Sequence, residues 1–123
     1  MSLLQDKPSA RKVTELLKQA MNGQARVLMS AVNYGEAYGI ILREYGRDRA
    51  TTAMNAVNPL PIDVLNITLK EAIRAAEVKH KYKLYYADSF AAALALEQKA
   101  TLVTSDSDFR KLGHGFPVLW LKA

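Results

Sequence analysis

Apolar positions along this chain follow two patterns, one with the spacing of an amphipathic helix and one of short continuous runs. Between residues 9 and 22 the apolar side chains recur at helical spacing, which places them on one face of a helix: Val13, Leu16, Leu17, Ala20 and Met21. The pattern predicts a helix that is capped by Ser9, runs to about Asn22 and ends at Gly23.

Short apolar runs without interruption are typical of strands buried on both faces, and they predict strands at 26–29, 62–67, 101–104 and 116–121. Helical patterns fill the intervals at 30–45, 47–57, 68–82 and 86–98, with a helical turn at 108–112. Ser30 is the expected N-cap of one helix, and Thr68 opens another in a capping-box pattern with Glu71. The alternation predicts an α/β fold with a mainly parallel sheet and helices on both faces, in one domain over residues 1–123.

Composition narrows the functional classes. The chain contains no Cys, which rules out disulfides and thiolate metal sites and agrees with a cytoplasmic setting. It has no apolar run long enough to span a membrane and no signal peptide at its start. The formal net charge of +5 favours polyanions, nucleic acid first, although many soluble domains are mildly basic without such a role. Gly-rich phosphate loops, H-E-x-x-H and G-x-S-x-G are absent, which argues against Rossmann or Walker nucleotide binding and against a zinc site.

Carboxylates occur where predicted strands end and predicted helices begin. Asp88 opens the helix at 86–98, Asp106 and Asp108 follow the strand at 101–104, and Glu36 lies in the second turn after the first strand. These ends share one edge of a parallel sheet, so we expect Glu36, Asp88 and Asp106 to converge there, with Asp108 nearby. Converging carboxylates repel one another, and a bound Mg²⁺ or Mn²⁺ is the usual compensation.

Each acid also has an ordinary structural explanation. Asp88 suits a helix N-cap, Asp106 suits a turn, and Glu36 suits the positive end of a helix dipole. The case for a metal site rests on the placement of all three at one predicted edge.

A basic and aromatic run, K-H-K-Y-K-L-Y-Y, leads directly into Asp88. Lysines neutralise phosphates and tyrosines stack on unpaired bases, so the run predicts an RNA-binding surface: Lys79, Lys81, Lys83, Tyr82 and Tyr86. The alternative is a solvated helix C-terminus, where lysines favour the dipole and the tyrosines are half buried.

At these residues the sequence resembles a PIN domain, in particular the ribonuclease toxins of the VapC type, over essentially its whole length. The family's middle acid matches Glu36 in S-A-V-N-Y-G-E-A-Y, and a later acid matches Asp88 in Y-A-D-S-F-A-A-A-L-A. The family's T-x-D-x-D-F strand end matches Thr104, Asp106, Asp108 and Phe109.

The resemblance implies a metal-dependent endoribonuclease of a toxin–antitoxin system, with a cognate antitoxin as partner and a homodimer or higher oligomer as its assembly. On this basis Glu36, Asp88 and Asp106 hold Mg²⁺ or Mn²⁺ and position the attacking water. Supporting roles fall to Asp108 as a further metal ligand and to Thr104 and Ser105.

The chain departs from the family pattern at its beginning. PIN domains are three-layer α/β/α folds that begin with a strand ending in Asp, followed by a short helix, and their sheet order is 3-2-1-4-5. This sequence begins after that point, so we expect an N-terminally truncated form without the central first strand and with impaired activity. The absence of this first strand and its Asp favours an alternative function, that of a catalytically inactive PIN-like module that binds RNA or protein. A flavodoxin-like regulatory domain fits less well, because its acids would lie in the first half of the chain.

Overall fold

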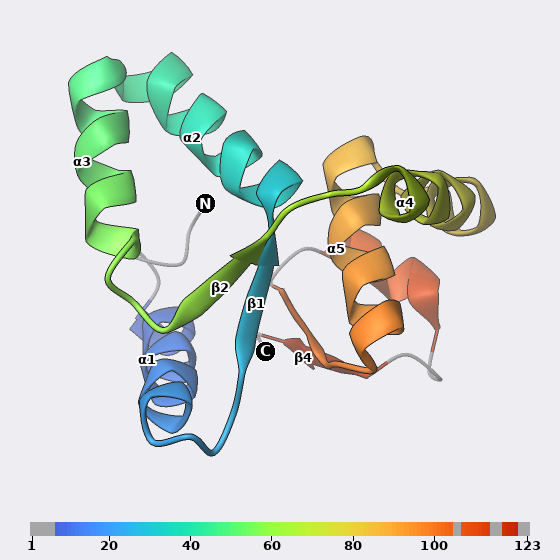
Figure 1. Cartoon of the computed structure of the whole chain (residues 1–123), viewed down its shortest axis with the longest axis horizontal. Coiled ribbons are helices and arrows are strands. Elements are labelled where there is room, and N and C mark those ends of the chain that lie inside the picture. Colours follow the sequence, from blue (N-terminus) through green and yellow to red (C-terminus); the bar gives the residue numbers. More distant parts are fainter. Residues whose placement is uncertain (1–6, 105–106, 114–116, 121–123) are drawn as a thin grey trace. The chain divides into compact units, whose positions relative to one another are not determined.

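The computed structural model (Figure 1) describes residues 7–104, 107–113 and 117–120, with side chains for 11–104, 109–113 and 117–119. The elements follow in the order α1 Lys7–Met21, β1 Val27–Ser30, α2 Ala31–Tyr45, α3 Arg47–Val57, β2 Ile62–Leu65, α4 Leu69–Tyr82, α5 Tyr86–Gln98, β3 Leu102–Thr104, the 3₁₀ helix η1 Ser107–Leu112, and β4 Val118–Trp120. They form two compact units, Met1–Asn66 and Ile67–Ala123, each of which is described by itself.

The first unit is built on a parallel strand pair. β1 and β2 run in the same direction, with Val27 opposite Ile62 and Ser30 opposite Leu65. At the start of the pair, Arg26 Nε donates to Asp63 Oδ2 at 3.1 Å. Both side chains are more than half exposed, so this ion pair contributes little to stability.

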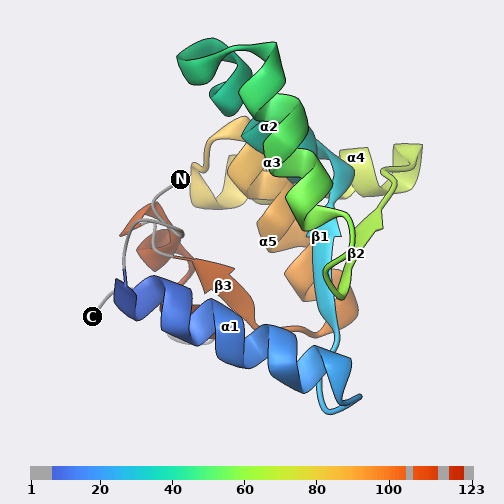
Figure 2. The ribbon, with the colours of Figure 1, turned by 90° about the vertical axis from the view of Figure 1, so that its left-hand side faces the viewer.

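Two helices form a hairpin in the same unit, and Figure 2 shows them side by side. The chain reverses at Gly46, whose φ of 90° lies in the region that favours glycine. The Tyr34 hydroxyl, early in α2, donates to Asn58 Oδ1 at the end of α3 over 3.0 Å. Ala50 and Met54 are the buried residues of α3, whereas α2 buries none of its residues fully. The two helices therefore contact each other mainly through half-buried residues and through the buried face of α3.

The second unit combines another parallel pair with two packed helices. β3 and β4 pair from Leu102 opposite Val118 to Thr104 opposite Trp120. α4 packs against α5, whose small buried residues allow close approach. The buried apolar residues of this unit are Ala75, Val78, Leu84, Phe90, Ala92, Ala93, Ala95, Leu102, Phe109 and Leu112. Nearly all of them come from helices and from the turn after β3, so the best-packed part of the unit surrounds α5.

The α/β class and the parallel pairing are confirmed. The order 3-2-1-4-5 places the strand at 62–67 beside the one at 26–29, and the strand at 101–104 beside the one at 116–121. Both neighbour relations are observed, as β1 with β2 and β3 with β4. In the described parts of the chain these are two-stranded sheets, so the single sheet and its missing first strand stay predictions.

Element boundaries required small corrections. The first helix begins at Lys7, so the prediction that Ser9 caps it is wrong. Pro8 falls in the first turn, where the missing backbone N–H costs nothing. β1 extends one residue beyond the predicted end, to Ser30, which is also the N-cap of α2. β2 ends two residues before the predicted end, at Leu65, and the chain then continues to Thr68, the N-cap of α4. Positions 116 and 121 of the last predicted strand lie outside the described residues.

No helix in the part of the chain that the structure describes is both long enough and apolar enough to cross a bilayer.

Candidate functional site

Asp88 lies in the first turn of α5 and is half buried. The N-cap of this helix is Tyr85, which makes no side-chain cap hydrogen bond, so the interpretation of Asp88 as an N-cap is wrong. The next residue, Ser89, is fully buried, and its hydroxyl donates to the Tyr86 carbonyl. Phe90 is also buried. The helix start that carries Asp88 is therefore fixed from both sides by packing and by its own hydrogen bonds.

Glu36 lies in the second turn of α2, directly after β1, as predicted. The helix start is set by Ser30, which is 1% exposed and accepts from the Asn33 backbone N–H at 3.1 Å. The Ser30 hydroxyl also donates to Asn33 Oδ1 at 2.7 Å. Glu36 itself is exposed. The first unit thus presents a single solvated carboxylate after a buried strand end.

The third acidic segment follows β3. Thr104 is the last residue of this strand and is half buried. Phe109, which is 5% exposed, anchors the 3₁₀ helix η1 that begins at Ser107 and includes Asp108. Ser105 and Asp106 lie outside the described residues, and so does the side chain of Asp108.

The structure brings some of these segments together within the second unit. α5, which carries Asp88, contacts β3, which ends at Thr104. Glu36 belongs to the other unit, so its convergence with Asp88 stays a prediction. Among the side chains that the structure describes, no three His, Asp or Glu residues form a group that could hold a metal, and this set lacks Asp106 and Asp108.

The available donors fit a hard cation in their chemistry. They are carboxylates with a hydroxyl at Thr104, and the chain has no Cys. Oxygen ligands of this kind suit Mg²⁺ and Mn²⁺, which retain several waters and share their remaining positions with substrate phosphates. The exposed Glu36 and the half-buried Asp88 leave room for such waters.

The basic run at the end of α4 is well exposed. Lys79, Lys81 and Lys83 all reach solvent, and Lys81 Nζ lies 5.2 Å from the centre of the half-buried Tyr82 ring. Tyr86 is 64% exposed, so a half-buried packing role fits Tyr82 but not Tyr86. The exposure of the run is compatible with contact to RNA, and its role as an RNA-binding surface stays a prediction.

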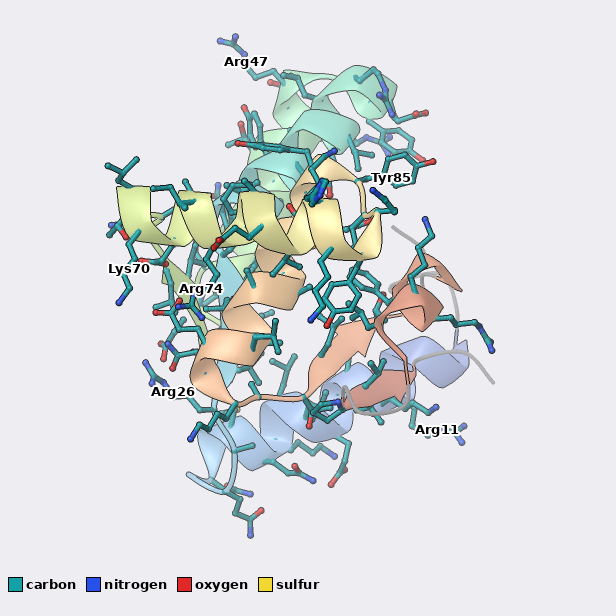
Figure 3. The ribbon with its side chains drawn as sticks, turned by 90° about the vertical axis from the view of Figure 1, so that its right-hand side faces the viewer. Arg11, Arg26, Arg47, Lys70, Arg74 and Tyr85 are labelled. Atoms are coloured by element: carbon teal, nitrogen blue, oxygen red, sulfur yellow. The ribbon has the colours of Figure 1, made fainter. Side chains whose placement is uncertain are left out.

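The structure adds Lys111 to this predicted surface, whereas Tyr85 belongs to the basic and aromatic run but was not among the residues named for RNA binding. Lys111 of η1 donates from Nζ to the Lys83 carbonyl at 3.1 Å, which adds a cation to the end of α4. Tyr85, which is 71% exposed, lies where the chain turns into α5 (Figure 3). Lys111 pairs with a residue 28 positions away, and no local pattern reveals that contact. The adjacent cations Arg110 and Lys111 after Phe109 were the available signal.

Two of the solved structures with a similar fold are a VapBC2 and a VapBC-1 structure. One is VapBC2 from Rickettsia felis bound to a DNA fragment from their promoter, with a TM-score of 0.71, 12% identity, and coverage of 94% of this chain and 86% of that one. The other is VapBC-1 from nontypeable Haemophilus influenzae, with a TM-score of 0.70, 18% identity, and coverage of 97% and 88%. A comparison with curated proteins gives no match.

The sequence itself matches the PIN domain family over residues 1–115. This range includes β1, β2 and β3, the helix start with Asp88 and the T-x-D-x-D-F segment, and it ends before β4. The chain therefore belongs to the PIN domain family.

Proposed function

We propose that the chain is a Mg²⁺- or Mn²⁺-dependent endoribonuclease of the VapC toxin type. Members of the PIN family are generally nucleases, and the family match covers most of the chain. The observation that carries the proposal is the position of Asp88 in the first turn of α5, a helix that contacts β3, the strand that ends at Thr104 of T-x-D-x-D-F.

The residues have distinct roles in this proposal. Glu36, Asp88 and Asp106 hold the cation, with Asp108 as a further ligand and Thr104 and Ser105 in support. The cation supplies a more acidic bound water and stabilises charge on a scissile phosphate. Asp88 is half buried in the first turn of α5, where the positive end of the helix dipole favours a carboxylate.

RNA is the proposed substrate because exposed cations and aromatic rings precede Asp88 in the chain. Lys79, Lys81 and Lys83 contact phosphates, and Tyr82 and Tyr86 contact unpaired bases. A cognate antitoxin is the proposed protein partner, which is supported by the likeness of the fold to chains of VapBC assemblies.

Cleavage of single-stranded RNA in the presence and absence of metal tests the function. We expect EDTA to abolish cleavage and added Mn²⁺ or Mg²⁺ to restore it. Glu36→Gln should lower the rate, whereas Glu44→Gln, two turns further along the same helix and also exposed, should not.

Binding without cleavage would support a different function. If RNA binds with Mn²⁺ present and no product forms at any metal concentration, the chain acts as a PIN-like binding module. If Glu36→Gln and Glu44→Gln behave alike while cleavage persists, Glu36 is not part of the site.

A further inference from the structure

The Lys111 ammonium of the second unit hydrogen-bonds to the backbone at the end of α4. Lys111 Nζ, on η1, donates to the carbonyl of Lys83 at 3.1 Å. Lys83 is the C-cap of α4, with φ 58° and ψ 43°, a left-handed conformation that disfavours a residue with a Cβ. An ammonium at a helix C-terminus also interacts favourably with the carbonyl end of the dipole. The contact therefore fixes where η1 meets the end of α4.

This corner gathers positive charge. Lys83 and Lys111 are exposed, Lys79 and Lys81 lie in the last turn of α4, and Arg110 precedes Lys111. A phosphate that binds at such a group of cations forms charge-assisted hydrogen bonds and releases counterions.

An aromatic ring adjoins the same corner. Tyr85 is 71% exposed, two residues after Lys83. Tyr86 packs edge-on against the buried Phe90, with ring centroids 5.0 Å apart. Among the described side chains, the Tyr85 ring has neither an aromatic nor a cationic partner. Its faces are therefore available to an unpaired base, with which stacking is favourable whatever the base identity.

We propose that Lys83, Lys111 and Tyr85 form a binding site for single-stranded RNA, in which the lysines contact the phosphate backbone and Tyr85 stacks on an adjacent base. The site rests on the proposed function in that RNA is taken as the substrate. Because Tyr85 lies three residues before Asp88, the site holds RNA beside the start of α5. A duplex fits poorly, because its bases are already stacked on one another.

The chain offers a matched pair of variants. Lys83 and Lys99 are both C-cap lysines with left-handed backbones, with φ of 58° and 51°. Replacing either by Gly removes one positive charge and suits the backbone equally. Lys99 lies at the far end of α5, about 20 Å along the helix from Tyr86. Lys83→Gly therefore tests the site, and Lys99→Gly controls for net charge and for the backbone.

Binding is measured on the full chain by fluorescence anisotropy with a labelled single-stranded RNA, in EDTA and at several salt concentrations. We expect Lys83→Gly and Lys111→Gln each to lower the magnitude of the slope of log affinity against log salt by about 0.7, and Lys99→Gly to leave it unchanged. Lys111→Gln keeps a hydrogen-bond donor for the Lys83 carbonyl, which separates charge from structure. Tyr85→Ala should weaken binding roughly 5- to 100-fold with little change in slope.

The anisotropy measurement requires no cleavage, so it tests the RNA-binding site independently of the proposed nuclease activity. If the chain cleaves no RNA but the variants still differ in binding as expected, the RNA-binding site is supported and the nuclease activity is not. Equal effects of Lys83→Gly and Lys99→Gly, or unchanged binding by Tyr85→Ala, would overturn the site.

Discussion

The side chain of Ser30 determines the local structure where β1 ends and α2 begins. It ends β1, caps α2 and is 1% exposed, and its hydroxyl both accepts from the Asn33 N–H and donates to Asn33 Oδ1. The direction in which α2 leaves the strand, and with it the position of Glu36, depends on these two hydrogen bonds.

Replacing Ser30 by Ala should lower the free energy of unfolding by about 1 kcal/mol, because a buried cap is lost. Thr68→Ala removes the cap of α4, where Thr68 is exposed, and should cost less, about 0.5 kcal/mol. Urea denaturation followed by circular dichroism measures both. A larger loss from Thr68→Ala would contradict the importance assigned to Ser30.

At the scale of single residues, helix caps could be predicted from the sequence, whereas hydrogen bonds between residues far apart in the chain could not. The caps at Ser30 and Thr68 follow from residue type and from the helical patterns after them. Asp88 looked like a cap because acids favour helix starts, but the helix begins two residues earlier, at Tyr86. The bond from Lys111 to Lys83 joins segments that only the folded chain brings together.

At the scale of elements, periodicity predicted types and approximate bounds. α3 and α5 begin and end where the helical patterns do, and the apolar runs became parallel strands. The strand at 62–67 was predicted too long, because apolar residues continue past Leu65 into the approach to the Thr68 cap. Apolar character alone does not distinguish a paired residue from a connecting one.

The glycines of α2 allow a prediction about the stability of this helix. Gly35 and Gly39 are exposed, and a Cβ built at either position meets nothing within 4 Å in the described structure. Glycines within a helix often allow close approach of another backbone, but the described structure shows no such approach at these two positions.

Gly35→Ala and Gly39→Ala should each raise the free energy of unfolding by about 1 kcal/mol, through higher helix propensity. Gly46→Ala is the control, since its φ of 90° makes the same replacement unfavourable. Thermal denaturation ranks the three variants. A destabilised Gly35→Ala or Gly39→Ala protein would mean that a partner approaches this face of α2.

At the scale of the whole molecule, each strand pair has an edge without a described partner. β1 pairs with β2 and β3 pairs with β4, so among the described strands none has neighbours on both sides. Exposed strand edges pair readily with another chain. Single-sequence patterns indicate strands but do not show which edges remain open.

We therefore expect a homodimer or higher oligomer, in which strand edges or exchanged elements of two copies pair. Light scattering across a wide range of protein concentrations measures the assembly. A monomer at every concentration, with an unchanged circular dichroism spectrum, would contradict this expectation.

The central claim is that Asp88 belongs to a metal-dependent catalytic site, and one comparison tests it most directly. Asp88 and Asp48 are both acids in the first turn of a helix, so replacing either by Asn removes the same favourable dipole interaction. The rate of Mn²⁺-dependent cleavage of single-stranded RNA is measured for both variants at saturating substrate. We predict that Asp88→Asn lowers the rate by at least about 100-fold, the scale of a catalytic carboxylate. Asp48→Asn should change it by no more than about twofold, as expected of a surface substitution. Equal rates for the two variants would contradict the account.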